Sequence, residues 1–354
     1  MRRFKFLKNP LATDLGNNLE EFLQRLDGPA CIFLDGEDET RTRALVTLLH
    51  GNEPSGAMAV FRWLKSCQRP AVNTVIILAS VTAALESPSF SHRMLPRARD
   101  LNRCFKPPFD DAQGALAEEI LEILRMHHPE AVIDVHNTSG SGPSFGVCTH
   151  LDEQHDALVS LYTQRLIVSN LKMGALMDIS EHSYPTVTVE VGGRLDDEAH
   201  ELAYDGMCRY LLSQDVFTPQ ETDWGLELLH DPIRLELADN VSLTYADKPN
   251  ASFDITLKTD VEHHNFGGVT PDTLLGWAEG AERSLFNAYD MGGRCAVTKL
   301  VRIENGELYP AQPLKLFMIT NNAAIAQSDC LFYAVADDGS AISANPDTDP
   351  EESS

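Results

Sequence analysis

The chain has 354 residues, of which 43% are hydrophobic and 7% aromatic, and its formal net charge at pH 7 is -25. This length exceeds one ordinary domain, and the composition is typical of a globular protein with a sizeable core. The negative charge repels nucleic acid and anionic membranes, so we expect neither as a partner; a small acidic ligand would require local arginines.

Cysteine usage and the start of the chain indicate a compartment. The seven cysteines are scattered and never form a CxxC pair, which is typical of a reduced protein. The first residues are basic but lack the apolar run of a signal peptide, and no apolar stretch reaches the roughly 18 residues of a membrane span. We therefore expect a cytoplasmic protein; the sequence gives no prediction of its oligomeric state.

Short apolar strands alternate with helices in the first part of the chain. Several of the strands are continuously apolar, which predicts an α/β fold with a mainly parallel sheet covered by helices on both faces. The expected strands are 29–36, 43–51, 74–80, 130–137 and 184–193, and the expected helices are 56–67, 112–128 and 155–171.

The alternation ends near residue 220. Short alternating strands with Gly, Pro, Asn and Asp turns follow, with almost no helical spacing, and the last stretch is polar, acidic and proline-bearing. We predict an α/β domain at 1–222, a smaller β-rich domain at 223–336 and a disordered acidic tail at 337–354.

The pattern His-x-x-Glu occurs three times, so its spacing alone does not select a site. The pairs are His50/Glu53, His127/Glu130 and His150/Glu153. Ligands of open α/β sheets bind beyond the carboxyl ends of the strands, and the first pair directly follows a strongly apolar strand. The second closes a helix at the opposite edge, where a histidine is an ordinary cap. The third also follows a strand and is the more serious competitor.

A third donor for a metal stands at the end of the strand "VIDVH". A lone histidine there is more often a cap or a packed side chain, but His136 ends its strand on the same sheet edge as His50 and Glu53. Catalytic zinc prefers histidine and carboxylate ligands and keeps one position open for water. The three residues together therefore indicate a zinc site.

Two further features carry chemistry. The segment "RMLPRARDLNRCF" gathers four arginines, whose guanidinium groups can bind carboxylates bidentately, unless the segment is a solvated loop. In "TVTVEVGG", Glu190 alternates with valines near the end of a strand, where a carboxylate in a partly apolar surrounding can shuttle a proton. The arginines are Arg93, Arg97, Arg99 and Arg103.

Four motifs resemble one known family. "HGNE" after a strand, "DLNR" some fifty residues later, "DVH" at a third strand end and "VEVGG" at a fourth strand are similar to the succinylglutamate desuccinylase and aspartoacylase family of zinc carboxypeptidase-like enzymes. The resemblance spans about residues 40 to 195, and "DVEHHNFGGVTPDTLLGW" at 260–277 is similar to the family's C-terminal β-domain.

The resemblance implies roles for particular residues. His50, Glu53 and His136 would bind one Zn²⁺ per chain, Glu190 would be the general base and acid, and Asp100 would orient the first zinc histidine.

On the substrate side, the resemblance implies that Asn102 and Arg103 grip a substrate carboxylate. Arg93 would polarise the scissile carbonyl, with Arg97 and Arg99 as alternatives. The segment between Arg93 and Asp100 is longer than in aspartoacylase, and no tyrosine matches the one that the family's C-terminal domain contributes. Tyr309 and Tyr333 are nearby candidates.

These implications predict a zinc-dependent hydrolase that cleaves an amide bond of a small carboxylate-bearing substrate. The expected reaction is deacylation of an N-acyl amino acid by metal-activated water, with Glu190 as base and acid. Two alternatives are a metallocarboxypeptidase acting on short peptides and a metal-binding module without catalysis.

Overall fold

The structure is a computed structural model that describes residues 3–138, 140–218, 226–340 and 342. They form two compact units: unit 1 comprises Met1–Thr138 and Ser144–Glu227, and unit 2 comprises Ser139–Pro143 and Leu228–Ser354. Except for 337–340 and 342, the acidic tail expected at 337–354 lies outside the described residues. The helices in these ranges lack the combination of length and hydrophobicity that a membrane-spanning segment needs.

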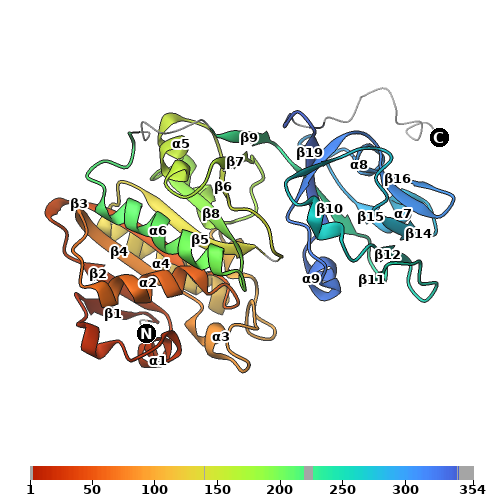
Figure 1. Ribbon diagram of the computed structural model, residues 1–354. Coiled ribbons are helices and arrows are strands. Elements are labelled where there is room, and N and C mark those ends of the chain that lie inside the picture. Colours follow the sequence, from red (N-terminus) through yellow and green to blue (C-terminus); the bar gives the residue numbers. More distant parts are fainter. Residues whose placement is uncertain (1–2, 139, 219–225, 341, 343–354) are drawn as a thin grey trace. The chain divides into compact units, whose positions relative to one another are not determined.

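Unit 1 is built on a mixed sheet whose described strands run in the order β1-β2-β4-β3-β5-β8-β6-β7-β9 (Figure 1). The central neighbours β4, β3, β5 and β8 are parallel, whereas the pairs β2–β4 and β6–β8 are antiparallel. The mainly parallel sheet predicted from continuously apolar strands is thus confirmed. The strands are β1 (Lys5–Lys8), β2 (Ala30–Leu34), β3 (Asp38–Thr47), β4 (Val72–Leu78), β5 (Val132–Thr138), β6 (Phe145–Cys148), β7 (Arg165–Val168), β8 (Thr186–Gly193) and β9 (Glu227–His230).

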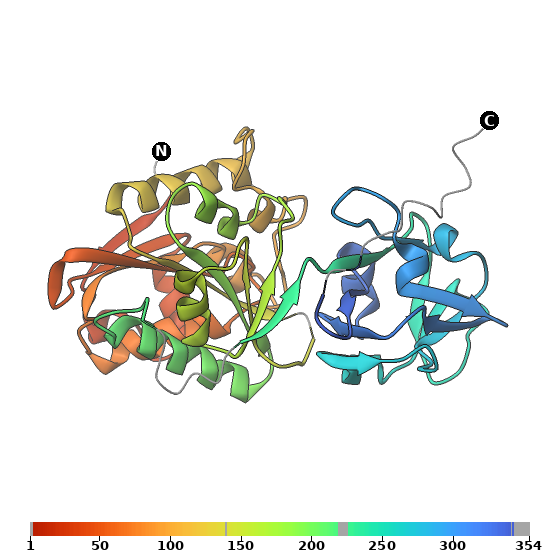
Figure 2. The same ribbon diagram turned by 90° about the horizontal axis from the view of Figure 1, so that it is seen from above.

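Helices cover both faces of this sheet, with α4 on one side and α2 and α6 on the other (Figure 2). The helix α4 begins at an Asp111 cap, whose side chain accepts from Gly114 N, and buries Ile120 and Ile123 against the sheet. The helical elements are α1 (Leu19–Leu26), α2 (Ser55–Ser66), α3 (Val81–Leu85), α4 (Ala112–His127), α5 (Glu153–Ser160) and α6 (Asp197–Leu212), with 3-10 turns η1 (Ala12–Asp14), η2 (Leu101–Arg103) and η3 (Leu176–Glu181).

One expected helix is wrong in its second half. The helix predicted at 155–171 ends at Ser160, and Arg165–Val168 form β7, which pairs in parallel with β6. Leu166 and Ile167 are buried there as strand residues, because the short apolar run "RLIV" extends the sheet rather than the helix. The sequence analysis also did not identify α6, although its buried residues recur at helical spacing.

Unit 2 is β-rich, as expected, and has its own hydrophobic core. Its described strands form two five-stranded sheets, ordered β13-β18-β19-β10-β15 and β11-β12-β14-β17-β16. The strands are β10 (Ile233–Leu237), β11 (Leu243–Tyr245), β12 (Ile255–Leu257), β13 (Gly267–Val269), β14 (Gly276–Ala278), β15 (Phe286–Asn287), β16 (Val301–Glu304), β17 (Glu307–Pro310), β18 (Leu314–Phe317) and β19 (Phe332–Ala336). The short helical elements are η4 (Val261–His264), α7 (Glu282–Leu285), α8 (Val297–Leu300) and α9 (Ala323–Ser328).

A buried arginine in the middle of β3 binds the end of α6. The Arg43 side chain is 0% exposed; its Nε donates to Glu130 Oε1 at 2.6 Å, and its Nη1 donates to the carbonyls of Tyr210 and Ser213 at 2.7 and 2.6 Å. These carbonyls lie at the helix C-terminus, where the helix provides no partners for them and a cation is favourable. Arg43 therefore anchors α6 to the sheet.

We expect Arg43→Met to lower the free energy of unfolding by about 3 kcal/mol, because it leaves Glu130 without its buried partner and the helix carbonyls unsatisfied. Urea unfolding of the full chain measures this loss. The control Arg69→Met removes an exposed ion pair with Glu39, at 3.1 Å, and should cost less than about 1 kcal/mol. Equal losses in the two variants would show that Arg43 is not an anchor.

Candidate active site

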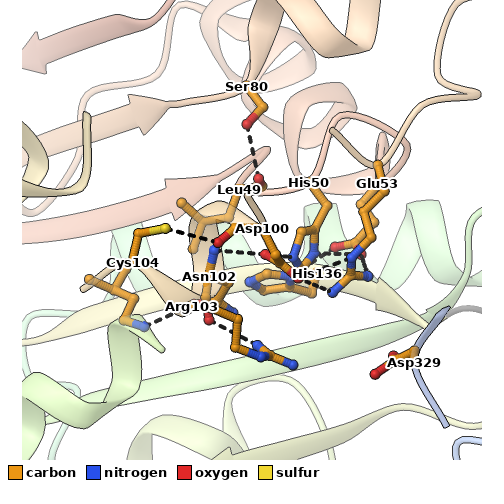
Figure 3. Close-up of polar contacts among 12 residues, drawn as sticks. Leu49, His50, Glu53, Ser80, Asp100, Asn102, Arg103, Cys104, His136 and Asp329 are labelled. Atoms are coloured by element: carbon orange, nitrogen blue, oxygen red, sulfur yellow. Dashed lines mark hydrogen bonds and ion pairs between the residues drawn. The ribbon is translucent and has the colours of Figure 1, made fainter. Parts of the chain in front are cut away.

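The candidate site lies where three parallel strands end. In the β3–β5 register Thr47 faces Val135, and in the β5–β8 register His136 faces Glu190. The turn after β3 carries His50 and Glu53, so these side chains meet His136 at one edge of the sheet (Figure 3). The sheet position predicted for these residues is therefore confirmed.

The turn after β3 has an unusual backbone. Leu48 has a φ of 54°, in the left-handed region that non-glycine residues rarely occupy. Ser80 holds this turn, because its N–H donates to Leu48 O at 2.6 Å and its hydroxyl donates to Leu49 O at 2.9 Å. A Cβ on Gly51 would lie 2.7 Å from the backbone of Ala83, so the close approach of α3 requires glycine there.

His50, Glu53 and His136 form a buried three-residue cluster. His50 Nδ1 lies 2.8 Å from Glu53 Oε1, His136 Nδ1 lies 2.8 Å from Glu53 Oε2, and the two Nδ1 atoms are 3.2 Å apart. The exposed fractions of the three residues are 4%, 6% and 2%. One ligand atom from each lies within 4.8 Å of the others, a separation at which one metal ion can bind all three.

The partners of the two Nε2 atoms determine which kind of ion the cluster can bind. His50 Nε2 lies 2.9 Å from Asp100 Oδ1, and His136 Nε2 lies 2.7 Å from Asp134 Oδ2, so each Nε2 carries a proton that it donates to a carboxylate. In neutral imidazoles both Nδ1 atoms then present lone pairs to each other and to Glu53. Such a convergence of acceptors requires a positive charge at its centre, and two histidines with one carboxylate are a donor set that suits zinc.

Electrostatics at the cluster agree with this conclusion. Burial disfavours a charged imidazole, but Asp134 and Glu53 raise the pKa of His136 well above its usual value. Burial likewise opposes ionisation of Glu53, yet His50 and His136 hold the pKa of that carboxyl well below its ordinary range. The protein therefore stabilises a cation between these groups, which can be a proton or a metal ion.

Asp100 and Arg93 surround the cluster on the side of η2. Asp100 Oδ1 accepts from His50 Nε2 and from Asn102 N, and Asp100 Oδ2 accepts from Arg93 Nη2 at 2.9 Å. Burial by itself would raise the pKa of Asp100. The hydrogen bond from His50 and the charges of His50, Arg93 and Arg103 outweigh burial, so the pKa lies well below its usual value. Arg93 Nη1 also reaches Glu53 Oε1 at 3.5 Å, so this arginine lies at the site.

The other arginines of the segment differ in position. Arg99 pairs bidentately with Asp111 at the start of α4, at 2.5 and 2.8 Å, and Arg97 is exposed. Arg103 is partly buried, and its Nη1 donates to Asn102 O at 2.8 Å. The structure thus brings Arg93 and Arg103 to the groups around Asp100 and directs Arg99 to a helix cap.

Glu190 stands beside His136 without a hydrogen-bond partner for one oxygen. Its Oε2 is enclosed and has no partner among the described residues. Burial raises the pKa of the Glu190 carboxyl to about 7; the imidazole of His136 opposes this rise, and the negative charge of Glu53 adds to it. A carboxyl group with a pKa near neutrality can both accept and return a proton.

The second His-x-x-Glu pair has structural partners. His127, at the end of α4, stacks on Phe33 with ring centroids 5.4 Å apart, and Glu130 binds Arg43 near the start of β5. The predicted location at the opposite edge of the sheet is confirmed.

The third pair lies away from the site because the strand before it, β6, runs in the opposite direction to the strands that carry the site. Because β6 runs antiparallel to β8, with Phe145 opposite Glu190, the end of β6 lies at the other edge. There Asp152 caps α5, accepts from Gln154 N and His155 N, and contacts both His150 and His155. Glu153 takes no part in these contacts. The capping role of Asp152 accounts for its position beside His150 and His155 without a metal ion.

Asp134 is a site residue that the sequence analysis missed. It is 0% exposed and contacts His136, as Asp100 contacts His50. Its signal was present in the sequence, because residues i and i+2 of a strand share a face. Each histidine of the cluster therefore has its own carboxylate.

In the predicted second domain, the two tyrosines considered as substrate contacts have partners within unit 2. Tyr309 donates its hydroxyl to Glu307 Oε2 at 2.6 Å, and Tyr333 is 8% exposed and stacks on Phe317.

Comparison with known proteins matches the part of the chain that carries the site to one family. Residues 39–209 match the family model of the succinylglutamate desuccinylase/aspartoacylase catalytic domain. Curated protein sequences give no match. Among solved structures, the succinylglutamate desuccinylase/aspartoacylase of Rhodobacter sphaeroides is 14% identical with a TM-score of 0.52, covering 82% of this chain and 83% of its own.

Two other structures are similar in fold at 17% identity and a TM-score of 0.51. They are the succinylglutamate desuccinylase of Vibrio cholerae, with 84% of this chain and 99% of its own covered, and murine aminoacylase 3, with 84% and 96% covered.

The fold and the site define an α/β protein whose mixed sheet carries, at its carboxyl edge, a buried two-histidine, one-carboxylate cluster that can bind a metal ion. At residues 39–209 this chain carries a domain that matches the succinylglutamate desuccinylase/aspartoacylase family, which is a family of zinc-dependent amide hydrolases.

We expect Asp134→Asn to weaken zinc affinity by roughly 10- to 100-fold, because the amide accepts the His136 proton less strongly and orients the ring poorly. Competition with a chelator measures the affinity. Asp152→Asn is the matched control, since Asp152 likewise contacts histidine side chains, His150 and His155, but at the other edge of the sheet, and it should leave the affinity unchanged. An Asp134→Asn protein with full affinity would contradict the orienting role.

Proposed function

We propose that this protein is a zinc-dependent hydrolase that removes the acyl group from a small N-acyl amino acid. The observation that carries the proposal is the convergence of His50, Glu53, His136 and Glu190 within the part of the chain that matches the family's catalytic domain. The family acts on acylated amino acids, which supports this substrate class. Unit 1 would be the catalytic domain and unit 2 the C-terminal β-domain.

His50 and His136, through Nδ1, and Glu53 would hold one Zn²⁺ per chain. Bound zinc would acidify a water molecule and polarise the carbonyl of the scissile amide. The hydrogen bonds to Asp100 and Asp134 keep both imidazoles in the tautomer whose Nδ1 can bind a metal.

Glu190 would act as the general base and then as the general acid. Its carboxylate takes the proton of the attacking water, and its carboxylic acid returns a proton to the leaving amine. The raised pKa and the unpartnered Oε2 support this role, because the group is basic near neutral pH and has an oxygen available for the proton.

Asn102 and Arg103 would bind the substrate carboxylate, and Arg93 would polarise its scissile carbonyl. Asn102 Oδ1 accepts from Leu176 N at 2.9 Å, and this bond orients the amide so that Nδ2 is the group offered to an anion. Arg103 supplies the planar donors that pair bidentately with a carboxylate. These donors would allow a protein with a net charge of -25 to accept an anionic substrate.

The function is tested with Glu190→Gln, which keeps the shape of the side chain but cannot accept a proton. We expect it to retain zinc and substrate binding and to lose at least roughly 100-fold in kcat on a panel of N-acyl amino acids and dipeptides. Preference for N-acyl amino acids supports a deacylase, and preference for dipeptides supports a carboxypeptidase.

Metal analysis provides the control for this variant. The unaltered protein should contain about one zinc per chain, which His136→Ala should lose and His150→Ala should keep. Near-normal turnover by Glu190→Gln would assign the proton transfer to another group.

We expect Arg103→Lys to reduce kcat/KM for carboxylate-bearing substrates, because lysine lacks the planar fork of the guanidinium. The loss of transition-state stabilisation should be about 2 kcal/mol or more. Substrates with an amide in place of the carboxylate should be poor already and lose little more. Arg99→Lys is the control, since Arg99 binds Asp111 instead. If Arg103→Lys impairs both kinds of substrate equally, Arg103 does not select the carboxylate.

A further inference from the structure

The side chain of Asn137 lies among the three segments that carry the site. Asn137 follows His136 in β5 and is 3% exposed. Its Nδ2 donates to Ser55 Oγ at 2.7 Å and to Gly192 O at 2.9 Å, and its Oδ1 accepts from Ser55 N at 3.0 Å. Both amide hydrogens and the amide oxygen are therefore used.

Each of these contacts reaches a segment with a functional side chain. Ser55 begins α2 two residues after Glu53, and Gly192 lies in β8 two residues after Glu190. The backbone N–H of Asn137 also donates to Glu53 Oε2 at 3.3 Å. One residue thus joins the turn of Glu53, the end of β5 and the end of β8.

The β ladder itself does not fix this region. The register of β5 with β8 shifts between His136 and Thr138, because His136 faces Glu190 while Thr138 faces Gly193. Gly192 has a φ of 118°, as expected at a bulge, and bulges re-aim the neighbouring side chains. The hydrogen bond from Asn137 to Gly192 O holds the bulged strand where regular pairing is interrupted.

The direction of the hydrogen bonds requires asparagine. Ser55 Oγ accepts from Asn137 Nδ2 and also lies within hydrogen-bond distance of His200 Nδ1, at 2.7 Å, on α6. An aspartate at position 137 could accept from Ser55 N but could not donate to Ser55 Oγ or to Gly192 O. It would also add a charge beside Glu53.

Resting on the proposed function, we propose that Asn137 is a positioning residue that sets the distance between the metal-binding cluster and Glu190. Glu190 Oε2 has no hydrogen-bond partner among the described residues, so no hydrogen bond to this oxygen holds the carboxyl in place, and its position follows the backbone of β8 that carries it. Asn137 holds that backbone against β5 and the turn of Glu53. It acts through these segments and not by contact with the substrate.

The test compares Asn137→Asp with Asn73→Asp in the full chain. Asn73 is a matched control: it is 9% exposed, lies near the start of β4, and its amide accepts from Gly36 N at 3.0 Å and donates to Glu39 O at 2.9 Å. We expect Asn137→Asp to lower kcat at least about tenfold on the best N-acyl amino acid, with KM within about threefold, since misplaced groups cost turnover more than binding.

The second readout is the visible absorption of Co²⁺ bound in place of zinc, which reports the geometry of the ligands without turnover. Asn137→Asp should change this spectrum, and Asn73→Asp should change neither the spectrum nor kcat, even if both lower the melting temperature. If the two variants behave alike in spectrum and kcat while the unaltered protein is active, the positioning role is wrong.

A milder variant keeps the test valid if Asn137→Asp does not fold. Ser55→Ala removes one acceptor of the Asn137 amide, and a folded Ser55→Ala protein should show a lower kcat and an altered Co²⁺ spectrum. Unaltered values for both would overturn the inference. An unaltered protein that binds no Co²⁺ and hydrolyses no N-acyl amino acid would instead contradict the proposed function itself.

Discussion

The parallel pairing of β3, β5 and β8 is the constraint on which the candidate site depends. Parallel strands place their carboxyl ends at one edge, so the turn after β3, the end of β5 and the end of β8 meet there. Glu53 can therefore lie between His50 and His136, with Glu190 beside them. The antiparallel strand β6 ends at the other edge, which removes its histidine motif from the site.

Charge at this edge explains why a divalent cation suits it. Around the two imidazoles, carboxyl groups outnumber guanidinium groups, and a divalent cation would compensate the excess of negative charge in this buried environment. Burial is the main cause that raises the pKa of Glu190 to about 7; the charge of His136 opposes this rise, and the carboxylate of Glu53 adds to it. The groups are Arg93 and Arg103 with Glu53, Asp100, Asp134 and Glu190.

The site also depends on two irregular backbone positions. Leu48, before the first metal-binding histidine, and Gly192, after Glu190, both have positive φ values. A left-handed non-glycine residue costs roughly 1–2 kcal/mol, which is offset here by surrounding structure. Ser80 holds the first position and Asn137 the second, through hydrogen bonds to backbone carbonyls. The functional side chains thus lie next to irregular backbone positions, which hydrogen bonds from neighbouring elements hold in place.

Local features can be read from the sequence alone: continuously apolar strands, the turn "HGNE" after one of them, the histidine at the end of "VIDVH" and the alternation that places Glu190 on one face near the end of its strand. These follow from strand period and residue chemistry, which are local. The direction of β6, the formation of β7 by "RLIV" and the bulge at Gly192 are set by the fold, because each depends on pairing with a distant strand. The role of Asn137 becomes evident for the same reason, since it arises from a contact with Gly192 across the sheet, whereas Asp134 and His136 form an i, i+2 pair within β5 that strand period alone could have indicated.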